Sequence, residues 1–147
     1  QGDMLVTPLQ IARMSACLCT GKLVKPRSLE SEECAEQELE ISSQTLQFLQ
    51  EAMREVVLNG TASSRRLNKI EGFEIYAKTG TAQICGLETK KLSKMHLEHA
   101  WFTGYFRYQG GNPLAFVVLI ENVGLSRPAV NFVENFLLRY KDLIEQD

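Results

Sequence analysis

Lys78-Thr79-Gly80-Thr81-Ala82-Gln83 is the stretch on which the prediction of the fold depends, and it directly follows a strand-like run, Phe73–Ala77. It sets a cation, a small hydroxyl residue and a glycine in consecutive strand positions. Lys78 brings positive charge to a place where an anionic group can bind, and the Thr79 hydroxyl can hydrogen-bond that anion. Gly80 has no side chain, so another backbone can approach the strand closely. The amide of Thr81 can then donate to a developing oxyanion.

Two questions about this stretch stay open in the sequence. A solvated strand end could carry the same letters without any function. Strict alternation along a strand also places the Lys78 and Thr79 side chains on opposite faces. Both can serve one site only if the strand is twisted or lies at a sheet edge.

The composition is that of one ordinary globular domain. The chain has 147 residues, of which 44% are hydrophobic, with a net charge of −2 and a sequence pI near 5.8. This length can hold one domain with a real core. A nucleic-acid-binding protein would usually show a basic patch or stripe, and none is evident. The longest apolar run, Leu114–Ile120, is too short to cross a bilayer and is predicted to be the most buried strand.

Local signals predict three helices. Thr7-Pro8-Leu9-Gln10 has an N-cap, a proline at the first helical position and a capping box, and Gly21 ends this helix after Thr20. The helix is apolar nearly all round, which predicts that it is largely buried. Ser42 or Ser43 caps a second helix that runs to about Leu58 and ends at Asn59-Gly60. A third begins near Pro128, after Ser126, with an apolar face at helical spacing.

Three strands are predicted between the second and third helices. They cover about Phe73–Gln83, His99–Tyr108 and Leu114–Glu121, and the last two form an antiparallel hairpin across Gly110–Pro113. The acidic stretch Glu30–Glu40 is interpreted as a solvated loop, and Ile84–Glu98 as an exposed basic connection. Segregated helices and strands predict an α+β fold, with an antiparallel sheet packed against helices.

The cysteines and histidines indicate no metal site. Cys17 and Cys19 lie two apart in a predicted helix, and no C-x-x-C pair or suitably spaced histidine accompanies them. Cys34 and Cys85 could form a disulfide in an oxidising compartment, but the default prediction is four thiols, mostly buried. His96 and His99 are expected to have surface or structural roles. We therefore expect neither a metal nor another cofactor.

Five segments carry motifs in a fixed order. Gln1-Gly2 with Val6–Ala12 is similar to G-Q-G-x-x-x-V-T-P-L-Q-L-A, Val56–Ala62 to V-V-x-x-G-T, and Lys78–Gln83 to K-T-G-T-A-Q. His99–Tyr105 is similar to H-A-W-F-x-G-Y, and Ala115–Asn122 to a last core strand. This ordered set resembles the class B penicillin-binding proteins, in particular the elongation-type penicillin-binding protein 2 group, over nearly the whole chain. One departure is Ala77, where many members have glycine.

The resemblance implies a serine transpeptidase and β-lactamase-like fold and a peptidoglycan D,D-transpeptidase activity. In that family a serine attacks a stem peptide ending in D-Ala-D-Ala, and β-lactam antibiotics trap the same serine. Lys78, Thr79, Gly80 and Thr81 would bind the substrate, Lys78 would add charge in the cleft, and the Thr81 amide would form half of the oxyanion hole. The implied location is the outer side of the bacterial cytoplasmic membrane, with the cell-wall elongation machinery as a partner and an anchor that this chain does not contain.

The family's nucleophile motifs are not in this sequence. No serine has a lysine three places later, and none begins an S-x-N. We therefore expect residues 1–147 to be the C-terminal portion of a transpeptidase domain, cut from a longer chain and inactive alone. A non-catalytic peptide- or carboxylate-binding module of cell-wall assembly is the alternative. A β-lactamase fits less well, because the V-T-P-L-Q and H-A-W-F segments belong with the transpeptidases.

Overall fold

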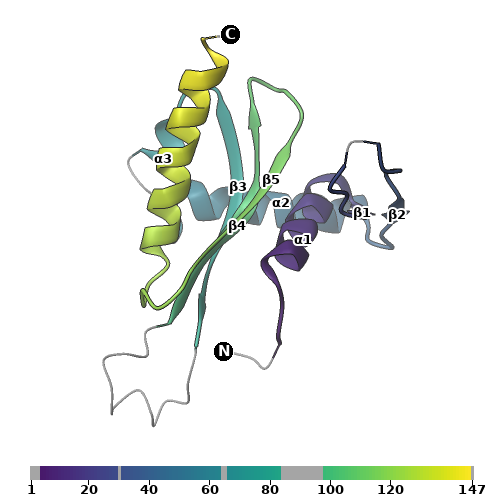
Figure 1. The fold of residues 1–147 in the computed structure, drawn as a ribbon, viewed down its shortest axis with the longest axis horizontal. Coiled ribbons are helices and arrows are strands. Elements are labelled where there is room, and N and C mark those ends of the chain that lie inside the picture. Colours follow the sequence, from purple (N-terminus) through teal and green to yellow (C-terminus); the bar gives the residue numbers. More distant parts are fainter. Residues whose placement is uncertain (1–3, 30, 64–65, 84–97, 147) are drawn as a thin grey trace.

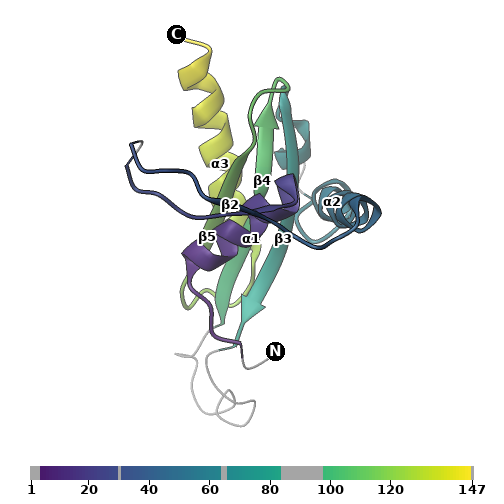
Figure 2. The same cartoon turned by 90° about the vertical axis from the view of Figure 1, so that its right-hand side faces the viewer.

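The computed structural model describes residues 4–29, 31–63, 66–83 and 98–146. A three-stranded antiparallel sheet with strand order β3-β4-β5 forms its centre (Figure 1). Helix α1 lies on one face of this sheet and α3 on the other, while α2 lies beside β3 (Figure 2). The elements in chain order are α1 (Pro8–Thr20), β1 (Lys22–Val24), β2 (Glu36–Glu38), α2 (Ser43–Leu58), a short 3₁₀ turn (Leu67–Lys69), β3 (Phe73–Ala82), β4 (His99–Tyr108), β5 (Leu114–Ile120) and α3 (Arg127–Ile144).

The predicted start and stop signals of α1 are confirmed. The Gln10 amide donates to the Thr7 hydroxyl at 3.3 Å, and the Thr7 amide donates to the Gln10 side chain at 2.8 Å. Gly21 adopts a left-handed conformation with φ of 76° and donates to the Cys17 carbonyl. The expectation that α1 is largely buried is wrong: Leu9 is 59% exposed. Because α1 crosses only one face of the sheet, the described residues cover one side of it (Figure 2).

Helix α2 agrees with its prediction at both ends. The Thr45 amide donates to the Ser42 hydroxyl at 3.0 Å, and the helix ends at Leu58, directly before Asn59 and Gly60. Met53 and Val57 are its buried residues. Val57 is fully buried in the main core, which joins the C-terminal end of α2 to the sheet. The position of this helix end matters, since the segment that follows reaches β3.

The three strands predicted around the K-T-G stretch are confirmed, and so is the α+β class. Strand β4 pairs with β3 on one side and with β5 on the other, both antiparallel. Within this register Ala77 lies opposite Gly104. A Cβ atom on Gly104 would lie 2.0 Å from the Tyr76 carbonyl oxygen and 2.7 Å from Ala77 Cα. Glycine at position 104 therefore lets β3 and β4 approach each other directly before Lys78.

Strand β5 is not the most buried strand, contrary to the prediction. Leu114 and Ala115 are exposed and the other five residues are half-buried. The reason is that β5 lies at the edge of the three-stranded sheet in the described part of the chain. A continuous apolar run indicates that both faces of a strand avoid water, but it does not indicate which neighbouring strands or helices cover those faces.

The acidic stretch is not wholly a loop. Glu36–Glu38 forms β2, which pairs antiparallel with β1 in a second, two-stranded sheet. The Lys22 ammonium bonds the Glu36 carboxylate at 3.0 Å and lies 3.5 Å from that of Glu38. All three residues of β2 are exposed, so the expected solvation is correct, while the pairing with a basic neighbour was missed.

The main core lies between the sheet and α3. Helix α3 buries Val130, Val133 and Leu137 there, as its apolar spacing predicts, although Phe136 and Leu143 on the same predicted face are exposed. The Ser126 side chain makes no capping bond to α3. Among the described residues, none of the helices is both long and apolar enough to span a bilayer.

The predictions for cysteines and histidines are resolved in part. Cys17 is buried, Cys19 is half-buried and Cys34 is exposed, all three as thiols, so "mostly buried" is too strong. Cys85 and His96 lie outside the described residues, as does nearly all of the Ile84–Glu98 connection. His99 has a structural contact, because its Nδ1 accepts a hydrogen bond from the Asn122 amide at 3.1 Å.

Candidate functional site at the edge of β3

Strand β3 has β4 on one side, and in the described part of the chain no strand pairs with its other side. The Gln109 amide donates to the Gly72 carbonyl at 2.8 Å, in register with the β3–β4 pairing. Because the peptide groups of successive residues alternate in direction, even-numbered residues of β3 face β4 and odd-numbered residues face the open edge. The peptide groups of Thr79 and Thr81 therefore point to the open edge.

Lys78 reaches this edge from the sheet face that carries α1. Its side chain is exposed, and its Nζ donates to the Thr79 carbonyl oxygen at 2.8 Å. Thr103 lies opposite Lys78 in the register, and its hydroxyl donates to the Phe116 carbonyl at 2.9 Å, so it accepts the 2.7 Å hydrogen bond from the buried Ser15 hydroxyl of α1. The ammonium group thus sits at the edge of the sheet, where a ligand's anionic group could replace the carbonyl as its partner.

Thr79 reaches the same edge from the other face. Its side chain is only 8% exposed, and its hydroxyl lies 2.6 Å from the Thr61 hydroxyl. A cation from one face and a pair of hydroxyls from the other therefore meet at one residue of an edge strand. This geometry answers the question of how neighbouring side chains on opposite faces could serve one site.

Thr61 was not predicted as a site residue. It lies in the segment after α2, and the structure brings it to β3 across 18 positions of sequence. The signal that could have found it is its place in the V-V-x-x-G-T segment, which carries a hydroxyl residue directly after a glycine. Spacing alone could not place that hydroxyl against Thr79, because the contact depends on how α2 packs beside β3.

Gly80 and Thr81 complete the four predicted site residues in the described chain. Gly80 lies opposite Trp101, and a Cβ on Gly80 would come within 3.2 Å of Trp101 Cβ. The glycine therefore gives room to a cross-strand tryptophan, whether or not a ligand also approaches there. Thr81 is half-buried and lies opposite Ala100.

Arg54 of α2 contacts the open edge of β3 near the start of the strand. Its Nη1 donates to the Ile75 carbonyl at 3.0 Å, and its guanidinium lies 5.7 Å from the Tyr76 ring centroid. Tyr76 in turn stacks on Tyr105 of β4, with ring centroids 4.7 Å apart. Burial raises the pKa of the Tyr105 hydroxyl far above its usual range, so Tyr105 stays neutral. These contacts hold α2 against the part of β3 that precedes Lys78.

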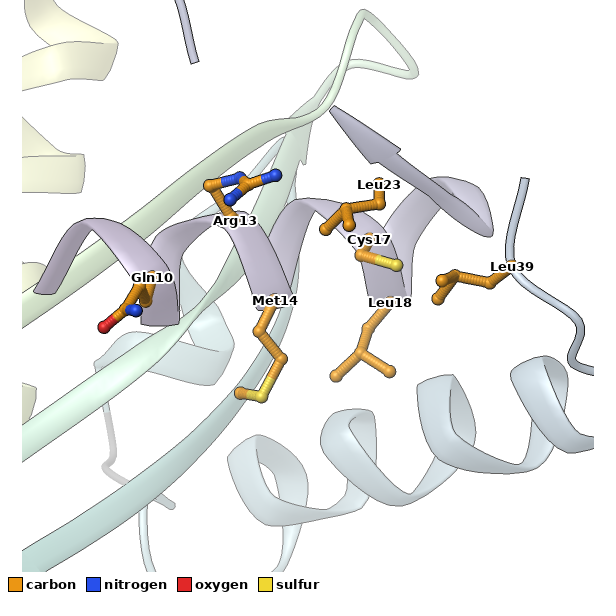
Figure 3. A pocket seen from close by; sticks show the side chains of 7 residues that line it. All are labelled: Gln10, Arg13, Met14, Cys17, Leu18, Leu23 and Leu39. Atoms are coloured by element: carbon orange, nitrogen blue, oxygen red, sulfur yellow. The ribbon is translucent and has the colours of Figure 1, made fainter. Parts of the chain in front are cut away.

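Another hollow in the chain does not share this chemistry. A cavity of about 260 Å³ lies among α1, β1 and the segment after β2, and its walls include Met14, Leu18 and Leu23 (Figure 3). Arg13, at its rim, donates to the Val24 carbonyl at 2.9 Å. No residue of β3 lines this cavity. Across the described residues, no group of three or more histidine, cysteine or acidic side chains is placed to ligate a metal.

The chain belongs to the penicillin-binding protein transpeptidase domain family, whose model matches residues 1–136. It is 30% identical over 143 residues to the peptidoglycan D,D-transpeptidase MrdA of Haemophilus influenzae (strain ATCC 51907 / DSM 11121 / KW20 / Rd), covering 84% of this chain and 22% of that protein.

A solved structure shares the fold. It is the complex between penicillin-binding protein PBP2 and MreC from Helicobacter pylori, with a TM-score of 0.74 and 26% sequence identity. The alignment covers 97% of this chain and 26% of that one. The chain therefore spans about a quarter or less of the length of these two relatives. These likenesses establish a penicillin-binding protein 2-like transpeptidase fold.

Proposed function

We propose that this chain is the C-terminal portion of the transpeptidase domain of a longer, penicillin-binding protein 2-like D,D-transpeptidase. The observation that carries the proposal is the convergence of Lys78 and the Thr61–Thr79 hydroxyl pair on the open edge of β3, within a member of this family. The chain contributes the strand that binds substrate. The catalytic serine comes from a part of the longer protein that this chain does not contain.

The substrate is a stem peptide ending in D-Ala-D-Ala. An extended peptide can add to an edge strand through main-chain hydrogen bonds, and β3 offers the outward peptide groups of Thr79 and Thr81 for this pairing. The Lys78 ammonium leaves the Thr79 carbonyl and binds the substrate's terminal carboxylate. The Thr79 and Thr81 side chains hydrogen-bond that carboxylate.

The reaction is acyl transfer through a covalent enzyme intermediate. The serine oxygen attacks the penultimate D-Ala carbonyl, an ester forms, and the amide bond to the terminal D-Ala breaks with release of that amino acid. An amine of a neighbouring stem peptide then attacks the ester, which gives the cross-link and returns the serine. The Thr81 amide donates to the oxyanion in both steps, and loss of such a donor costs about a hundredfold or more in rate.

Partners and place follow from the same proposal. β-Lactams acylate the serine as mimics of the donor peptide. The cell-wall elongation machinery is the protein partner, in line with the MreC complex of the Helicobacter pylori relative. The domain works on the outer side of the cytoplasmic membrane, with its anchor in another part of the longer protein. The chain alone does not react with penicillin, since no serine in it has a lysine three places later.

The native protein provides the test. Intact cells are exposed to labelled penicillin, and an antibody raised against this chain is used for immunoprecipitation. A labelled band much larger than 16.6 kDa supports a full-length penicillin-binding transpeptidase. Captured protein without label would instead favour a non-catalytic binding module, and the proposed reaction would be abandoned.

A further inference from the structure

We infer that Thr61 is a positioning residue that acts through Thr79 on recognition of the substrate carboxylate. The inference deepens the proposed function and depends on it. Thr61 is exposed at the open edge of β3, and its hydroxyl makes a 2.6 Å bond to the Thr79 hydroxyl. The Lys78 ammonium donates a hydrogen bond to the carbonyl oxygen of the same Thr79.

The direction of the hydroxyl bond decides what Thr79 can do. A threonine hydroxyl has one proton to donate and two lone pairs that accept. If Thr79 donates to Thr61, no proton is left for an anion. If Thr61 donates to Thr79, the Thr79 proton is available to a carboxylate, and the chain of two bonds strengthens both. An anion beside the Lys78 ammonium selects the second arrangement. Thr61 thereby makes Thr79 a donor at the moment that the anion binds.

The segment that carries Thr61 is built to hold this hydroxyl still. The Gly60 amide donates to the Glu55 carbonyl at 3.0 Å, and the Ala62 amide donates to the Val56 carbonyl at 3.1 Å. Ala62 is 1% exposed and belongs to the main core. A Cβ at Gly60 would lie 2.8 Å from Val56 Cα, so the chain winds too tightly there for a side chain. Thr61 is thus fixed on both sides by backbone that cannot shift easily.

The test uses the full-length protein with two ligands, one with a free carboxylate and one in which that carboxylate is masked as a neutral ester. Second-order acylation rates are measured for benzylpenicillin and for its neutral methyl ester. The variants are Thr61→Val, which keeps the shape but removes the hydroxyl, Thr61→Ser, which keeps the hydroxyl, and Thr79→Val alone and combined with Thr61→Val. Thr45→Val is the matched control, because Thr45 also forms a hydroxyl pair, 2.8 Å from Ser42, at the other end of α2.

The expected result is a selective loss. Thr61→Val lowers the rate with benzylpenicillin by about three- to tenfold, the range of one net hydrogen bond, and lowers the rate with the ester by less than about twofold. Thr61→Ser and Thr45→Val react like the wild type. In the Thr79→Val background, removal of the Thr61 hydroxyl has no further effect.

Other outcomes distinguish a failure of the inference on Thr61 from a failure of the proposed transpeptidase function. An equal loss with both ligands would show that Thr61 only supports the fold, and an unchanged rate with benzylpenicillin would show that its hydroxyl has no part in recognition. Either result overturns the inference and leaves the proposed function in place. A wild-type protein that reacts with neither ligand would overturn the proposed function, and the inference with it.

Discussion

Replacing Gly104 by alanine tests whether the approach of β3 to β4 positions Lys78. A Cβ at this position would lie 2.0 Å from the Tyr76 carbonyl oxygen, 2.7 Å from Ala77 Cα and 2.8 Å from Ala77 Cβ. A comfortable carbon–oxygen contact is about 3.3 Å, so the two backbones must separate by about 1.3 Å. Neighbouring strands lie about 4.8 Å apart, and a rotamer change cannot relieve a contact between main chains.

The expected cost follows from that displacement. Overpacking a well-filled core costs about 1–3 kcal/mol, and here the backbone hydrogen bonds around the Ala77–Gly104 pair must also lengthen. We therefore expect Gly104→Ala to lower the free energy of unfolding by about 3 kcal/mol or more. For a domain of this kind that corresponds to a fall of about 6–12 °C in the melting temperature.

The assay is thermal denaturation of the full-length protein, with penicillin acylation as a second measurement. Gly110→Ala is the matched control: Gly110 has a φ of 73° and nothing within 4 Å of an added Cβ, so its cost is conformational only, about 1 kcal/mol. Acylation should fall in Gly104→Ala and not in Gly110→Ala, because the displaced Ala77 directly precedes Lys78. If Gly104→Ala melts no lower than Gly110→Ala, the close approach has been misjudged and the reasoning is refuted.

Two further predictions concern the surroundings of the site. Arg54→Met removes the bond to the Ile75 carbonyl and the contact with the Tyr76 ring, and it should lower the free energy of unfolding by about 1–3 kcal/mol in chemical denaturation. The control Arg139→Met, at an exposed position, should lower it by less than about 0.5 kcal/mol. Equal costs would contradict the role of Arg54. Burial raises the pKa of the Cys17 and Cys19 thiols, so less of their thiolate exists at a given pH. Alkylation mapped by mass spectrometry should therefore modify the exposed Cys34 before Cys19, and the Cys19 rate should increase as the pH is raised; Cys19 reacting as fast as Cys34 at neutral pH would count against that burial.

The helices could be predicted from sequence because their signals are local. Thr7, Gln10 and Gly21 make the bonds that their spacing predicts, and Ser42 caps α2 as expected. These contacts span only three or four residues, so the tertiary structure hardly alters them. The extent of the three central strands was also predicted, because strand-like runs bounded by turn residues are visible in the sequence, although the strands pair over long range.

Errors arose where burial depends on neighbours. The apolar run of β5 indicates burial on both faces, yet β5 lies at an edge among the described residues. The apolar surface of α1 likewise meets the sheet on one side only. The spacing of apolar residues indicates which residues avoid water, but it does not indicate how far neighbouring elements bury them.

The sequence proposes residues for the candidate site but does not give their arrangement in space. Lys78 through Thr81 were predicted from the motif, while their convergence on the edge of β3 depends on the register with β4. Thr61 was missed as a site residue because its contact with Thr79 is made by the packing of α2 against β3. Long-range contacts of this kind have no signal in local spacing.

The role proposed for Lys78 at the edge of β3 is tested most directly by the rate at which penicillin acylates the full-length protein with and without the Lys78 ammonium. Wild type, Lys78→Ala and Lys25→Ala are compared, Lys25 being an exposed lysine outside β3. We predict rapid acylation of the wild type and of Lys25→Ala, and a loss of about a hundredfold or more in Lys78→Ala, as for the removal of an electrostatic group from an acyl-transfer site. A Lys78→Ala protein that is acylated at a near-normal rate would contradict the role proposed for the edge of β3.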